Sequence, residues 1–146
     1  MTELRRVYTE IDARDRIVDA ALAVFSDRGF AGATMRAIAE AANVSPGLIH
    51  HHFKDKEKLW NLVGERISAE FLEAVSLDAD ADASLPPSER LRRAVERYQR
   101  YWKEHPQALR FQLWRVLGAP VEERKARSKM LNGHFVPMMK EAQDAG

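Results

Sequence analysis

The 146-residue sequence contains no cysteine, no long apolar run and no glycine-rich phosphate loop. The lack of cysteine excludes disulfides and thiolate zinc sites and agrees with a reducing cytoplasm. A membrane-spanning helix needs about 20 consecutive apolar residues, and no segment approaches that length. The N-terminal stretch MTELRRVYTEIDARD also lacks the apolar centre of a secretion signal. We therefore expect a cytoplasmic protein with no membrane partner.

The sequence also lacks a strong net charge. Lys and Arg total 23 and Asp and Glu total 22, which gives a formal net charge of +1. Domains that bind nucleic acid are usually strongly basic, so any DNA contact would need locally concentrated positive charge. Such a concentration does occur, at Arg36, Lys54, Lys56 and Lys58. Whole-chain charge therefore does not exclude a nucleic-acid partner.

The spacing of apolar residues is helical nearly throughout, and no stretch has a convincing strand pattern, so we predict an all-α fold. Asp12 forms a cap-like start for a first helix, and Gly29 is placed to end it. Pro137 should kink or break the last helix. Further helix boundaries are predicted at caps, turns and prolines: Thr34, Asn43-Val44, Ser45-Pro46, Asp55, the linker 76–87, His105-Pro106 and Ala119-Pro120.

The segment 34–56, TMRAIAEAANVSPGLIHHHFKDK, predicts two short helices joined by a tight turn. Thr34 caps the first helix and Ser45 the second, and Pro46 takes the first helical position, where a missing N–H costs nothing. A short helix held clear of the body by the helix before it is the element that enters a DNA major groove.

The second helix of this segment has one apolar face. Ile49 and Phe53 lie four residues apart and suit the core. Gly47 lets the backbone approach DNA closely, and Leu48 suits apolar contact with a thymine methyl group. The residues left facing outward are Pro46, Gly47, Leu48, His50 and His51.

This segment closely resembles the helix-turn-helix of the TetR family of bacterial transcriptional regulators. The match covers about residues 14 to 60 and is carried by Gly29-Phe30, Thr34, Ile38-Ala39, Ala42, Val44-Ser45, Gly47, Ile49, His52-Phe53, Lys56-Glu57 and Leu59. The resemblance implies a three-helix DNA-binding head at residues 1–54 and a helical effector-binding body at 55–146.

The resemblance also implies roles for individual residues at a double-stranded DNA operator. The phosphate-side or orienting residues are Thr34, Ser45, His50, His52 and Lys56. The base-facing residues are Arg36, Pro46, Gly47, Leu48 and His51. Position 50 is usually tyrosine in such motifs and position 48 a small hydroxyl residue, so His50 and Leu48 leave the operator sequence open.

In TetR regulators the helices after the head enclose a pocket for a small-molecule effector, and ligand binding changes the spacing of two heads. The implied function is therefore a ligand-responsive repressor of a palindromic operator. Aromatic side chains at helical spacing more often form plain core than a ligand pocket. The candidate lining residues are Trp60, Phe71, Tyr98, Trp102, Phe111, Trp114, His134 and Phe135.

TetR regulators usually carry two further helices, which pair across a two-fold axis. This chain ends at Gly146, near the expected close of its seventh helix. We therefore expect a homodimer for the complete protein, with the segment that normally dimerises missing from this chain. The same fold acting through protein partners, or as an activator without a ligand, stays open as an alternative.

Two other kinds of site are weaker interpretations. The linker acids Asp78, Asp80 and Asp82 with Glu89 match positions of a calcium-binding loop, although Ala83 stands where that loop needs glycine. Adjacent residues on a helix point about 100° apart, so the three consecutive histidines at 50–52 cannot converge on one metal ion. We expect no metal site there. Because no nucleophile–base pair appears either, we predict no enzyme activity and no cofactor.

Overall fold

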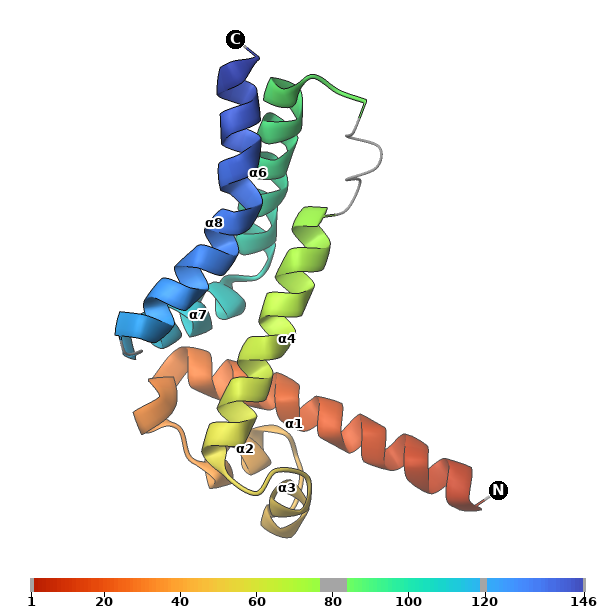
Figure 1. The fold of residues 1–146 in the computed structure, drawn as a ribbon. Coiled ribbons are helices and arrows are strands. Elements are labelled where there is room, and N and C mark those ends of the chain that lie inside the picture. The colour runs from red at the N-terminus through yellow and green to blue at the C-terminus, as the bar shows by residue number, and fades with distance from the viewer. Residues whose placement is uncertain (1, 77–83, 119–120, 146) are drawn as a thin grey trace. The chain divides into compact units, whose positions relative to one another are not determined.

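The computed structural model describes residues 2–76, 84–118 and 121–145 (Figure 1). For residues 2–11, 121, 123, 127, 130–132, 134 and 135 it describes the backbone alone. The described residues form helices and no strand, which confirms the predicted all-α fold. The helices are α1 (Thr2–Gly32), α2 (Met35–Ala41), α3 (Pro46–His52), α4 (Lys56–Ser76), α6 (Pro87–Glu104), α7 (Pro106–Gly118) and α8 (Val121–Asp144).

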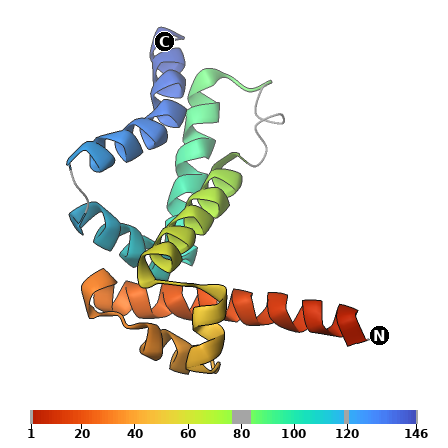
Figure 2. The same cartoon turned by 60° about the horizontal axis from the view of Figure 1, so that its bottom comes forward.

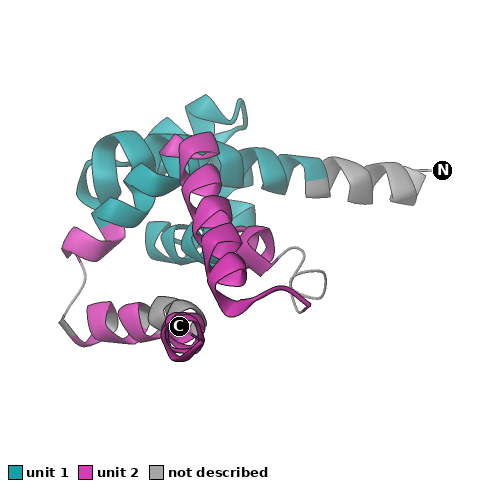
Figure 3. Cartoon of the chain, turned by 90° about the horizontal axis from the view of Figure 1, so that it is seen from above, with its two compact units in different colours: residues 1–68, 107–114 teal, residues 69–106, 115–146 magenta. Residues whose placement is uncertain are grey.

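The chain folds into two compact units (Figure 3). Unit 1 contains residues 1–68 and 107–114, and unit 2 contains residues 69–106 and 115–146. Helix α4 therefore begins in unit 1 and ends in unit 2. The functional division predicted between residues 54 and 55 is a separate matter and stays a prediction.

Helix α1 begins ten residues before the predicted start, at Thr2. The prediction of an N-cap at Asp12 was wrong because the residues before it include neither glycine nor proline and continue the helix. Asp12 lies inside α1, where its carboxylate pairs with Arg16 Nε at 3.5 Å. The predicted role of Gly29 is confirmed in part: its φ of 66° and ψ of −176° interrupt the helix, and one more turn follows to Gly32.

Unit 1 has a core of aliphatic and aromatic side chains. Its largest fully buried residues include Phe25, Ile17, Ile38 and Leu59. The Trp60 ring meets Phe25 edge-on at a centroid distance of 4.9 Å. Phe111 of α7 joins the same cluster, 4.4 Å from Trp60, and is completely buried. Residues of α7 are thus part of the core that supports the helix-turn-helix.

Unit 2 has a smaller core, centred on Phe71, Val75 and Tyr101. Phe71 stacks on Trp102 with ring centroids 5.1 Å apart and an interplanar angle of 22°. Helices α6 and α8 lie side by side (Figure 1, Figure 2), and Arg90 of α6 forms an ion pair with Glu141 of α8.

The remaining helix boundaries follow local sequence signals. Pro86 is the N-cap of α6, and α6 ends before His105-Pro106, as predicted. Of the kink or break predicted at Pro137, the break is not present, because α8 continues through this residue. A proline removes a single ladder hydrogen bond, and the other bonds of a long helix can outweigh that loss. Among the helices of the described residues, none has the length and apolar character needed to cross a bilayer.

Candidate nucleic-acid interface

Two side-chain caps define the helix-turn-helix. The Thr34 hydroxyl oxygen accepts a hydrogen bond from the Ala37 amide at 3.1 Å and starts α2. The Ser45 hydroxyl oxygen accepts one from the Leu48 amide at 3.2 Å and starts α3. Between them Asn43 adopts φ 53°, a conformation that asparagine tolerates better than most residues. Both predicted caps and the predicted turn are confirmed.

Helix α3 has one face in the core and one face in solvent. Ile49 is completely buried and Phe53 is 5% exposed. Five residues of α3 and its N-cap are exposed, and Leu48 is half-buried beside them. The exposed residues are Ser45, Pro46, Gly47, His50 and His51. The base-facing residues predicted on α3 therefore share an accessible surface.

Gly47 is not required by the fold. Its φ lies outside the left-handed region, and among the described residues a Cβ placed there would meet only the Ser45 hydroxyl oxygen, at 4.0 Å. A methyl group at this position would point into open space. Because residue 47 has no side chain, the backbone of α3 stays accessible at this point. No packing contact within the described part of the chain requires glycine here.

The predicted DNA-contact residues that lie outside the exposed face of α3 differ in how accessible their side chains are to DNA. Arg36 lies on α2 with an 84% exposed side chain and pairs with Glu40 at 2.9 Å. An exposed pair of this kind is worth at most about 1 kcal/mol, so Arg36 is free to exchange Glu40 for DNA. His52 is half-buried, and its Nε2 is buried without a hydrogen-bond partner in the described part of the chain.

Lys56 begins α4 and is turned toward α1. Its ammonium donates hydrogen bonds to the carbonyl oxygens of Phe30 at 2.7 Å and Ala33 at 2.9 Å. The neighbouring Asp55 caps α4 by accepting from the Lys58 amide at 2.8 Å, as predicted. The structure thus brings the predicted motif residues onto one helix-turn-helix, with Lys56 at its junction with α4.

Known proteins resemble this chain in both sequence and structure. Residues 17–63 match the family described as bacterial regulatory proteins, tetR family. The HTH-type transcriptional repressor NicS of Pseudomonas putida is 32% identical over 137 residues, which cover 91% of this chain and 62% of NicS. The crystal structure of a TetR-like transcriptional regulator from Rhodococcus sp. RHA1 matches with a TM-score of 0.74 and 26% identity, over 91% of this chain and 73% of that one.

The chain belongs to the TetR family. Other relatives match mainly in the head: the HTH-type transcriptional repressor AcnR of Corynebacterium efficiens is 39% identical over 66 residues, 45% of this chain and 35% of AcnR. The chain therefore spans about a third of AcnR and under two thirds of NicS. The TetR family is one of transcriptional regulators and not of enzymes.

The predicted effector-lining residues of this TetR-family chain fall into two groups. Trp60, Phe111 and Trp114 belong to unit 1, where Phe111 is plain core. Phe71, Tyr98 and Trp102 belong to unit 2, where Phe71 is part of the core and its ring contacts the other two. The side chains of His134 and Phe135 lie outside those that the structure describes.

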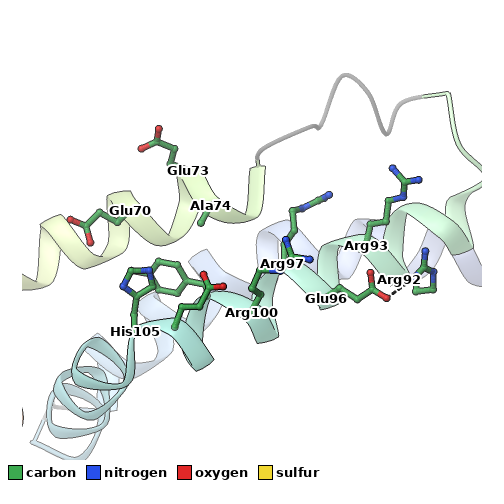
Figure 4. Close-up of a pocket in the computed structure, with 11 residues that line it drawn as sticks. Glu70, Glu73, Ala74, Arg92, Arg93, Glu96, Arg97, Arg100 and His105 are labelled. Carbon is green, nitrogen blue, oxygen red and sulfur yellow. Dashed lines mark hydrogen bonds and ion pairs between the residues drawn. The ribbon is translucent and has the colours of Figure 1, made fainter.

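Unit 2 also contains a cleft of about 640 Å³ with a mainly charged lining (Figure 4). Glutamates of α4 and arginines of α6 form its two sides. The helical spacing of Arg93, Arg97 and Arg100 puts them on one face of α6, and this spacing is visible in the sequence. The lining residues are Glu70, Glu73, Ala74, Arg92, Arg93, Glu96, Arg97, Arg100, Tyr101, Glu104 and His105.

Ion pairs organise the arginine side of this cleft. Arg92 bonds to both Glu89 and Glu96, and Arg93 Nε lies 3.3 Å from Glu89. Glu96 pairs with Arg92, which lies four residues before it on α6. The hydrogen bond from Arg92 is the main cause that lowers the pKa of Glu89 to about 2.

The calcium interpretation gains no support from this geometry. Asp78, Asp80 and Asp82 lie outside the described residues. Glu89, the predicted bidentate ligand, lies in the first turn of α6 and is bonded to Arg92 and Arg93. Its oxygens are therefore already satisfied by guanidinium groups.

Proposed function

We propose that this chain is the DNA-binding head and part of the regulatory body of a ligand-responsive repressor, which acts on a palindromic operator in the cytoplasm. The observation that carries the proposal is the exposed face of α3. Ile49 is buried beneath that face, and Ser45 caps the helix. The face includes Gly47, and no packing contact of the described residues requires glycine at that position. Membership of the TetR family supports the same function.

The exposed side chains divide by the chemistry that each can offer to DNA. Arg36 carries a fork of donors suited to guanine, and His51 offers a ring nitrogen to a base edge. Lys54, exposed after the end of α3, offers a point charge suited to phosphate. Phosphate contacts set affinity and its salt dependence, whereas base contacts set sequence preference.

The test of DNA binding compares single variants on a preferred duplex selected from a random-sequence library. Arg36→Ala or His51→Ala should broaden the selected sequence, with a cost of about 1–3 kcal/mol for each lost base contact. Lys54→Ala should weaken binding to all duplexes alike and reduce the salt slope by about 0.9. Lys125→Ala, in an exposed pair with Glu122 on α8, is the control that should change neither. A library from which no duplex is enriched would refute the proposal.

The regulatory part of the proposal assigns the effector to the α4–α6 cleft of unit 2. Its lining combines charged groups with the aliphatic parts of long side chains, so it favours a small molecule with both charged and apolar parts over a purely hydrophobic effector. A screen of small charged compounds should find one that raises the melting temperature of the wild type and releases its DNA, with both effects weakened in Arg100→Ala. A releasing compound that is indifferent to Arg100→Ala would place the effector elsewhere.

Dimerisation belongs to the proposal for the whole protein. Two heads on a two-fold axis would read half-sites about 34 Å apart. The support for this is the resemblance to the TetR family.

A further inference from the structure

Helix α1 ends without a cation of its own. Its last turn contains no basic residue, although the final carbonyl groups of a helix lack partners within the helix and carry partial negative charge. The interruption at Gly29 sets the last turn apart from the helix before it. The carbonyls of Phe30 and Ala33 at this end therefore need donors from another part of the chain.

Lys56 supplies those donors from the first turn of α4. Its ammonium lies 2.7 Å from the Phe30 oxygen, 2.9 Å from the Ala33 oxygen and 4.4 Å from the centre of the Phe30 ring. The Phe30 ring in turn meets Trp60, one turn further along α4, edge-on at 5.4 Å. Two of the three ammonium protons are thus used inside the protein, in a site that also offers the face of an aromatic ring.

We propose that Lys56 is a positioning residue, which holds the α1–α2 connection against the start of α4. Ala33, one of its two acceptors, is buried and directly precedes Thr34, the cap of α2. Fixing the Ala33 carbonyl therefore fixes the point at which α2 begins, and α2 carries α3 through the turn at Asn43. The family resemblance placed Lys56 among the phosphate-side or orienting residues, and the geometry assigns its charge to the end of α1.

A neighbouring lysine provides a matched control. Lys58 lies in the same turn of α4, is exposed, and its ammonium approaches Asp55 at 3.7 Å. Among the described residues, Lys58 makes no contact with the end of α1. Lys56→Met and Lys58→Met each remove one charge and keep an unbranched side chain, so they differ only in the connection that is lost.

The first measurement is amide hydrogen exchange of the full chain without DNA. Lys56→Met should speed exchange of the α2 amides by about tenfold or more, because hydrogen bonds to a charged donor hold the start of that helix. Lys58→Met should leave those amides at the wild-type rate. Equal exchange in Lys56→Met and wild type would overturn the proposal.

The second measurement needs no variant and therefore stands even if Lys56→Met fails to fold. In the wild-type protein the Lys56 ammonium protons should exchange with water slowly enough to give a nitrogen-correlated NMR signal, assigned by its contacts to the Phe30 ring. The Lys58 ammonium should exchange too fast to be seen. A Lys56 ammonium that exchanges as fast as that of Lys58 would overturn the proposal.

The third measurement separates positioning from phosphate contact and rests on the proposed DNA-binding function. A lysine that only contacts phosphate would lower the salt slope by about 0.9 when replaced and leave the free protein unchanged. That combination in Lys56→Met would overturn the proposal. If no duplex binds the wild type, the proposed function fails, but the exchange and NMR measurements still decide the role of Lys56.

Discussion

Replacing Gly29 with alanine tests the junction between α1 and the rest of unit 1. Gly29 has φ 66° and ψ −176°, a region of backbone conformation that is almost restricted to glycine. A Cβ on this residue would lie 3.0 Å from two carbon atoms of the Trp114 ring. The same ring donates its Nε1 hydrogen to the Ser26 carbonyl at 3.2 Å. The substitution therefore strains the backbone and pushes on a side chain that is already tethered.

The two effects can be estimated separately. The backbone conformation should cost about 1–3 kcal/mol with alanine. Displacing a packed ring usually costs about 1–3 kcal/mol more, and the lower end applies because Trp114 is 43% exposed and can move. Together they lower the free energy of unfolding by about 2–4 kcal/mol, and at about 3 °C per kcal/mol the melting temperature should fall by about 6–12 °C.

The assay is thermal and urea unfolding followed by circular dichroism. Gly133→Ala is the matched control, because Gly133 lies inside α8 and no atom of the described residues lies within 4 Å of an added Cβ. It should stabilise the protein by about 0.5–1 kcal/mol. Introducing Gly29→Ala into a Trp114→Ala background should retain only the backbone part of the cost. A melting temperature for Gly29→Ala equal to that of the wild type would refute the reasoning.

Two further predictions concern the core of unit 1 and the ion pairs of unit 2. Phe111→Ala should lower the free energy of unfolding by about 3–5 kcal/mol, because the ring is completely buried and its centroid lies 4.4 Å from that of Trp60. Leu117→Ala, at a 75% exposed position, should change the free energy of unfolding by less than about 0.5 kcal/mol in urea unfolding. Equal losses in the two variants would contradict the assigned burial. The Glu89 pKa is lowered from 4.5 to about 2, chiefly by the hydrogen bond from Arg92, so its stabilising effect is complete above pH 4.5 and disappears as the pH falls toward 2. Glu89→Gln should remove that part of the acid-unfolding curve, and an identical curve for the variant would show that the pair contributes nothing.

The helix-turn-helix was predictable because its signals are local. Thr34, Ser45 and Asp55 each bond to an amide three residues ahead, so the sequence itself contains both partners. The start of α1 was not predictable in this way, because Asp12 suits a cap and also suits a helix interior beside Arg16. The effector site depends on which helices face each other, and spacing along one helix does not determine that. The aromatic residues consequently suggested one pocket where the structure has two clusters and a charged cleft.

Like the effector site, the contact made by Lys56 could not be predicted from local sequence signals. A similar contact lies at the other end of α4. Helix α4, like α1, has no basic residue in its last turn. Arg97 of α6 compensates within unit 2 by donating from Nε to the Val75 carbonyl at 3.1 Å. Each of these helix ends thus receives its cation from a residue more than twenty positions away. A search for local caps finds neither, because the favourable charge at the end of a helix depends on position in space and not on the chain that supplies it. Within unit 1 the start of α4 is held to the end of α1, and within unit 2 its end receives a hydrogen bond from α6.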